Sequence, residues 1–220
     1  MAGCTPLALA WYKPDSTTGS RDNMLELFRE NFLLVALLVV SSSPAHHVQA
    51  QAPIKPATVY HQGAVTIVSP NQPGWMLVRS SKTETLFEKR SEIELLNAGV
   101  KTFKTKVFET DKELLVSLEN MKDQELSKLK RDSLHFYHLQ FRATPCVQYD
   151  GIFTGDASAA NFQYFNFKGY LCRQPGTKDI VIQMELTAHT NHRGFTESLH
   201  SLSQDFFEKV VLSNPSATTQ

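Results

Sequence analysis

Hydrophobic and polar residues alternate in several stretches of the chain with the two-residue period of β-strands. Residues 75–80 (WMLVRS) and 85–90 (TLFEKR), joined by a polar turn at 81–84, predict a β-hairpin. A second hairpin is predicted at 162–173 and 180–189, because the QPGTKD segment between them contains a Pro-Gly pair typical of tight turns. The remaining predicted strands are, in chain order, 64–68, 100–108, 134–141 and 146–153.

A different pattern, with apolar residues three and four positions apart, predicts an amphipathic helix from about Asp111 to about Lys130. Thr110 and Glu113 form a capping-box pair at its start, in which each side chain can bond a free backbone N–H. Lys122 is expected on the polar side of this helix. The apolar positions are Leu114, Leu115, Leu118, Met121, Leu126 and Leu129.

A second amphipathic helix is predicted at 196–212, near the C-terminus. Its apolar stripe consists of Leu199, Leu202, Phe206 and Val210. The predicted elements therefore follow the order strands, helix, four strands, helix, with short links and no alternating βαβ series. This order predicts an α+β fold in which a mainly antiparallel β-sheet is packed by two amphipathic helices.

The domain is expected to span 63–213, after a proline-containing linker at 51–62 and before a flexible tail at 214–220. An apolar run at 32–40 (FLLVALLVV) precedes the linker and is followed by a polar stretch with small residues near its end. This pattern predicts a secretory signal peptide cleaved between Ala50 and Gln51.

The predicted leader thus covers residues 1–50. Residues 1–23 do not resemble a signal sequence, so translation starting at Met24 is an alternative. As a helix, the apolar run at 32–40 would be about 14 Å long, about half of the roughly 30 Å hydrocarbon core of a membrane. No permanent membrane span is expected, although a membrane-tethered structural protein that retains this run is the alternative.

Cysteine usage agrees with export. Of the three cysteines, Cys4 lies in the predicted leader, and Cys146 and Cys172 remain in the domain. An even pair in an oxidising compartment favours one disulfide, which would close a loop of about 26 residues and stabilise the fold by about 3 kcal/mol. The alternative is a free Cys146 that acts as a nucleophile, but no histidine lies in an activating motif beside it.

Composition narrows the possible functions. Lys and Arg together number 22, as do Asp and Glu, and the formal net charge is zero. No basic stripe favours nucleic-acid binding or an anionic membrane surface. The chain has no P-loop, no G-x-G-x-x-G and no G-x-S-x-G motif, and no cofactor is expected.

Three histidines, His189, His192 and His200, lie between the last predicted strand and the last helix, where they could hold zinc or copper. Their spacing matches no metal signature, so surface histidines are the favoured interpretation. Asp150 is a candidate acid–base group beside them, but its Asp-Gly context is typical of a turn.

Aromatic residues are dense at the start of the predicted strand 162–173. Phe165 and Phe167 are expected in the core. The candidate binding patch consists of Phe162, Tyr164 and Tyr170, which would give a ligand or partner an apolar surface. Packing of the aromatic cluster in the core is the favoured interpretation.

Four segments resemble a group of exported bacterial proteins of unknown function that share a PsbP-like fold. They are GWMLV at 74–78, PCVQYDG at 145–151, GYLCRQP at 169–175 and FFEKVVL at 206–212. The resemblance implies a compact α/β/α sandwich outside the cytoplasm that binds or scaffolds. The two domain cysteines occupy the group's characteristic positions, which implies that the strands at 146 and 172 are bridged.

The sequence therefore predicts an exported, non-catalytic binding or accessory domain, periplasmic or secreted. Its partner is expected to be a cell-envelope protein or a small apolar ligand, and not a nucleic acid. A periplasmic enzyme that uses Cys146, or a metal held by His189, His192 and His200, is the alternative from another functional class.

Overall fold

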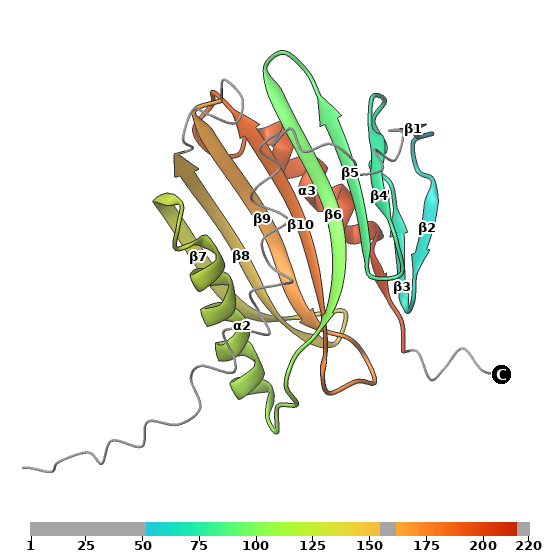
Figure 1. The fold of residues 1–220 in the computed structure, drawn as a ribbon, viewed down its shortest axis with the longest axis vertical. Coiled ribbons are helices and arrows are strands. Elements are labelled where there is room, and N and C mark those ends of the chain that lie inside the picture. Colours follow the sequence, from blue (N-terminus) through green and yellow to red (C-terminus); the bar gives the residue numbers. More distant parts are fainter. Residues whose placement is uncertain (1–51, 155–161, 215–220) are drawn as a thin grey trace, which may run out of the picture. The chain divides into compact units, whose positions relative to one another are not determined.

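Antiparallel pairing dominates the computed structural model, which describes residues 52–154 and 162–214 (Figure 1). Eight strands form one sheet in the order β1-β4-β5-β6-β10-β9-β8-β7. The strands are β1 (Ala52–Pro53), β4 (Met76–Ser80), β5 (Glu84–Arg90), β6 (Glu94–Lys104), β7 (Lys130–Phe141), β8 (Thr144–Thr154), β9 (Tyr164–Arg173) and β10 (Ile180–Thr190). Two antiparallel series, β4-β5-β6 and β7-β8-β9-β10, thus meet where β6 pairs with β10.

A smaller sheet of three strands has the order β11-β3-β2. Its strands are β2 (Val59–Gln62), β3 (Val65–Val68) and β11 (Val211–Leu212). Val65 and Ile67 of β3 are fully buried and belong to the same hydrophobic cluster as strands β5, β6 and β10. The small sheet therefore packs on one face of the large one.

Two helices cover opposite faces of the large sheet: α2 (Asp111–Leu126) and α3 (Glu197–Lys209). On the α2 face, Leu114 and Leu118 pack in one cluster with Val147 and Leu171 of the sheet. Successive residues of a strand point to opposite faces, and the cluster on the α3 face accordingly contains the neighbouring Cys146 and Cys172.

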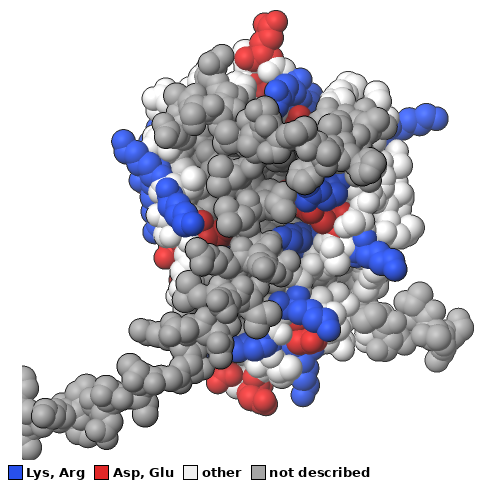
Figure 2. All heavy atoms as spheres, in the orientation of Figure 1, with Lys and Arg blue, Asp and Glu red and all other residues white. Residues whose placement is uncertain are grey.

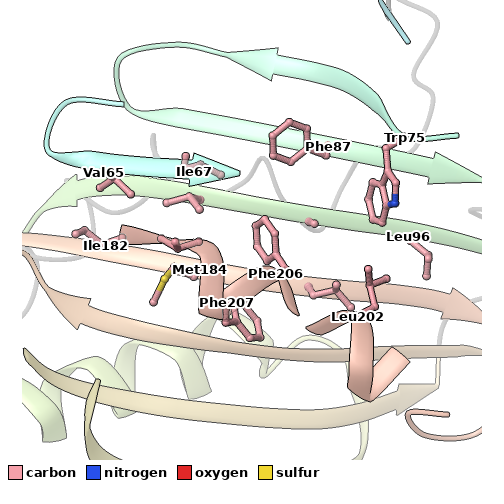
Figure 3. Close-up of a cluster of buried hydrophobic side chains, with 14 of the residues drawn as sticks. Val65, Ile67, Trp75, Phe87, Leu96, Ile182, Met184, Leu202, Phe206 and Phe207 are labelled. Atoms are coloured by element: carbon pink, nitrogen blue, oxygen red, sulfur yellow. The ribbon is translucent and has the colours of Figure 1, made fainter. Parts of the chain in front are cut away.

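Figure 3 shows the cluster on the α3 face, in which Leu202 and Phe206 of α3 lie close to Trp75, Phe87 and Leu96. Burial of large apolar side chains on both faces of the sheet is the main source of stability for such a fold. The predicted α+β class, with an antiparallel sheet between two amphipathic helices, is confirmed.

The predicted linker at 51–62 is wrong in its described part, since this part contains β1 and β2. Tyr60 packs edge-on against the ring of Phe87 at a centroid distance of 5.2 Å, and Gln62 is buried. Gly63, with φ of +58°, makes the tight turn into β3. The prolines of this segment favour a linker, but its last residues form the short strand β2, which pairs with β3 in a hairpin.

Both helices end earlier than predicted, and in each case a strand follows within a few residues. The first ends at Leu126 with Ser127 as C-cap, and β7 begins at Lys130. The second ends at Lys209, because Val211 and Leu212 pair with β3 instead of continuing the helical stripe. An apolar residue at the end of a helical pattern can equally be buried by a strand, so periodicity alone misplaced both ends.

The strand predicted at 100–108 is displaced along the chain, because β6 spans Glu94–Lys104. Its first half, ELLNAG, has no β-branched residue, yet β5 and β10 pair with it on both sides. Phe108 lies beyond the strand and is buried in the cluster beneath α2. Strand pairing on both edges overrides a weak local preference.

In the part of the chain that the structure describes, no helix is long and apolar enough to cross a membrane. The predicted leader at 1–50, the cleavage site at Ala50 and Gln51, and all of the predicted tail except its first residue lie outside the described residues.

Candidate functional site

Cys146 and Cys172 are joined by a disulfide between adjacent strands. They are direct partners in the register of β8 and β9, with Cα atoms 4.2 Å apart, and both are fully buried. In this state Cys146 has no thiol that could ionise, and therefore it cannot act as a nucleophile.

The three candidate metal-ligating histidines do not come together. His189 packs against the ring of Phe165 on the α2 face of the sheet, at a centroid distance of 4.7 Å. His200 lies on α3, on the other side of the sheet, beside Phe195, and His192 is exposed in the turn between them. Among residues 52–154 and 162–214, no group of three or more His, Cys, Asp or Glu side chains could hold a metal ion.

His189 is expected to make the fold sensitive to acid. Burial, and then the positive charge of Arg90, lower the pKa of His189 below its ordinary value of 6.5. The unfolded chain therefore takes up a proton more readily than the native state as the pH falls through about 6.5, and the free energy of unfolding decreases. Urea titrations between about pH 7.5 and 5.5 should show a smaller decrease for His189→Gln than for the unchanged protein.

His192→Gln is the matched control for this prediction, because His192 is exposed. An equal pH dependence in all three proteins would contradict the assigned environment of His189.

The candidate aromatic patch is divided along β9. Phe162 lies two residues before this strand and Tyr164 is its first residue, and both are half-buried. Tyr170 lies six residues further on, about 20 Å away at the rise of a strand, and packs against Phe207 and Phe141 at centroid distances of 5.0 and 5.1 Å. The structure therefore does not join these three rings into one surface.

A buried polar cluster beneath α2 was not anticipated by the sequence analysis. Lys122, predicted on the polar side of its helix, is 1% exposed. Its Nζ lies 2.7 Å from Glu185 Oε2 and 3.1 Å from a carboxylate oxygen of Glu125. Tyr149 Oη donates a hydrogen bond of 2.6 Å to Glu185, and Gln183 Nε2 donates another of 3.2 Å. The prediction for Lys122 is wrong.

Opposite charges lie next to one another in this buried cluster. Burial alone would lower the pKa of Lys122, but the carboxylates of Glu185 and Glu125 raise it above its usual value. Burial and the neighbouring Glu185 raise the pKa of Tyr149 well above its usual value, so its hydroxyl stays protonated and donates. Since the ammonium, the Glu185 carboxylate and the phenol bind one another, we assign the cluster a role in stability.

One signal for this cluster exists in the sequence. Leu114, Leu118, Lys122 and Leu126 are spaced by four and form one stripe of the helix, which places the lysine between two buried leucines. Glu185 lies in β10, whose residues are almost all buried. A lysine between two buried leucines of a helix, together with an acidic residue in a strand of the large sheet, points to a buried ion pair.

A recess with a volume of about 210 Å³ lies on the α3 face of the sheet. Strands β7, β8 and β9, the turn before α3 and the first part of α3 contribute its lining, which consists of Ser133, His135, Asp150, Gly151, Ile152, Lys168, Phe195 and His200. We call this feature the α3-face recess. Of these residues, Asp150 and His200 are among the candidates that the sequence indicates.

Charged groups of both signs line the α3-face recess. Asp150 and Lys168 are direct partners in the register of β8 and β9, but no ion pair joins them. Asp150 instead contacts His135, with 3.1 Å between Oδ2 and Nδ1. Among the described residues, no side chain forms an ion pair or hydrogen bond with Lys168, so its ammonium remains available to a ligand.

Figure 2 shows the opposite face of the large sheet, the one that α2 covers. Basic and acidic side chains are interspersed over its described part, in keeping with the balanced composition. Arg173 of β9 and Asp111 of α2 form an ion pair with a bond of 2.8 Å. Exposed pairs of this kind contribute little to stability.

No protein-family model and no curated protein sequence matches the chain. Solved structures do match it. A cyanobacterial PsbP from Synechocystis is 11% identical with a TM-score of 0.43, and the match covers 79% of this chain and 98% of that protein. The Ran-binding protein Mog1p of Saccharomyces cerevisiae is 14% identical with a TM-score of 0.40, covering 76% of this chain and 97% of that one.

A crystal structure from Bacteroides thetaiotaomicron is 10% identical with a TM-score of 0.43, and the match covers 72% of this chain. The chain spans about half of the length of that protein, 49%. The PsbP-like resemblance in the sequence thus has a counterpart among solved structures. At these identities and scores the likeness concerns the backbone and carries no ligand or partner with it.

Proposed function

We propose that the chain is an exported, non-catalytic binding domain, periplasmic or secreted, and that the α3-face recess is its ligand site. The observation that carries this proposal is the ammonium of Lys168 inside the recess, which has no ion-pair or hydrogen-bond partner among the described residues. In the buried cluster beneath α2, by contrast, the ammonium of Lys122 is bound by two carboxylates. A polar group without a protein partner in a concave, partly apolar site is typical of a ligand-binding position.

The disulfide and the scattered histidines support a binding role over catalysis. Cys146 is oxidised, and His189, His192 and His200 lie apart, so the groups of the enzymatic alternative are not assembled. The disulfide also supports the exported location, because such bonds persist in oxidising compartments. Intact mass of the full chain after secretion tests export: the expected product begins at Gln51 and lacks the two cysteine thiol hydrogens, and an uncleaved chain with free thiols would contradict it.

Binding is tested by ¹H–¹⁵N NMR of the full-length chain, titrated with a small-molecule fraction of periplasm. We expect amide shifts at Asp150, Ile152 and Lys168. In Lys168→Met the same shifts should require at least about tenfold more of the fraction, because a charge-assisted hydrogen bond is lost.

Lys178→Met is the matched control, since Lys178 is an exposed lysine in the turn between β9 and β10. Shifts elsewhere with none at the recess, or identical titrations for the Lys168 and Lys178 variants, would contradict the proposed site. Chemical turnover of any component of the fraction would contradict the non-catalytic role.

A further inference from the structure

Two opposite charges, those of Asp150 and Lys168, line the recess on the same face of the sheet but form no ion pair with each other. The register of β8 and β9 places Asp150 directly opposite Lys168, and the two side chains remain unbonded to each other. Asp150 uses Oδ2 for its contact with His135, and among the described residues no hydrogen bond reaches its Oδ1. One acceptor of the carboxylate and the ammonium of Lys168 are therefore both available at adjacent positions.

Apolar groups lie beside these charges. Ile152 is two residues beyond Asp150 in β8 and points to the same face of the sheet. Phe195, in the turn before α3, also lines the recess, and its ring centroid lies 5.5 Å from that of His200. A ligand held by the charged pair would thus meet Ile152 and Phe195 with an apolar part.

Size restricts the ligand further. Pockets for drug-sized molecules usually have volumes of about 300–1,000 Å³, whereas this recess has about 210 Å³. A water molecule takes up about 30 Å³ in the liquid. The space therefore suits a molecule with about ten non-hydrogen atoms or fewer.

We infer that the α3-face recess binds a small zwitterion of the free amino-acid class with an apolar side chain. Lys168 binds the carboxylate, Asp150 accepts hydrogen bonds from the amine, and Ile152 and Phe195 contact the side chain. A ligand with a single negative charge would be repelled by Asp150, and one with a single positive charge by Lys168. A molecule that carries both groups on one carbon satisfies both residues, and this inference rests on the proposed ligand site.

The experiment compares three probes of similar size on the full-length chain: L-leucine, 4-methylpentanoate and 3-methylbutylamine. NMR titration at neutral pH should give saturable shifts at the recess for leucine. We expect each single-charge analogue to bind at least about tenfold more weakly, because each leaves one charged group of the recess without a partner.

Charge-removing variants sharpen this comparison. Lys168→Met should weaken leucine binding at least about tenfold and strengthen binding of the amine. Asp150→Asn should weaken leucine binding and strengthen binding of the carboxylate. Lys178→Met is expected to bind all three probes as the unchanged protein does, and thermal unfolding verifies that each variant is folded.

The outcomes separate the two proposals. If either analogue binds as tightly as leucine, the zwitterion class is overturned while the ligand site stands. If leucine produces no shifts at the recess, the inference is overturned, and the periplasmic fraction then decides the proposed function independently. Leucine shifts that are equal in the Lys168 and Lys178 variants would overturn both.

Discussion

Replacing Lys122 with alanine is expected to lower the free energy of unfolding by about 3–5 kcal/mol, since removal of one partner leaves a buried charge unpaired. Glu185 would keep hydrogen bonds from Tyr149 and Gln183 but lose the ammonium 2.7 Å away. Urea denaturation followed by tryptophan fluorescence at neutral pH measures this loss.

Lys112→Ala provides the matched control, because Lys112 lies on the same helix and is exposed. It should change the free energy of unfolding by about 0.5 kcal/mol or less. The double variant Lys122→Met/Glu185→Gln should recover part of the stability lost in Lys122→Ala, because the Glu185 position no longer carries a buried charge that has lost its ammonium. Equal losses for Lys122→Ala and Lys112→Ala would show that Lys122 is not buried in an ion pair.

Removing the disulfide in the double variant Cys146→Ala/Cys172→Ala should lower the free energy of unfolding by about 3 kcal/mol in the chain-entropy model. The bridge joins residues 26 positions apart and therefore restricts the unfolded chain. Both positions are fully buried, so loss of the sulfur atoms from the core adds to the cost. Chemical denaturation of the oxidised protein and of the double variant gives the difference.

Unchanged protein that is denatured in excess reductant supplies the control. Its stability should approach that of the double variant, because both lack the covalent constraint. If oxidised and reduced proteins unfold at the same denaturant concentration, the bridge is not closed in solution.

The sequence predicted best those parts of the fold that depend on neighbouring residues. The hairpin of β9 and β10 follows from the turn at Pro175 and Gly176, where the glycine has φ of +75°. The N-cap hydrogen bond from the Glu113 amide to Thr110 is also present, at 3.2 Å. Signals of this kind act within a few residues and need no knowledge of the tertiary structure.

Long-range contacts explain what the sequence could not supply. Lys122 is buried because Glu185, 63 residues away, provides its counter-charge. The α3-face recess was missed for the same reason, since Ser133, Asp150 and Lys168 meet only through the register of three strands. Residues 94–99 are not predicted as a strand, because pairing with β5 and β10, and not their composition, makes them part of β6.

The position of β10 in the sheet determines when the domain can fold during synthesis. β10 is the last strand of the large sheet along the chain, but it lies between β6 and β9 near the middle. A nascent polypeptide that stops before Ile180 therefore leaves all 11 residues of β6 as an open edge, able to pair with other chains. β10 also contributes residues to the hydrophobic clusters on both faces of the sheet. These clusters are incomplete until this strand is inserted, so the domain is assembled near the end of synthesis rather than progressively from its N-terminus.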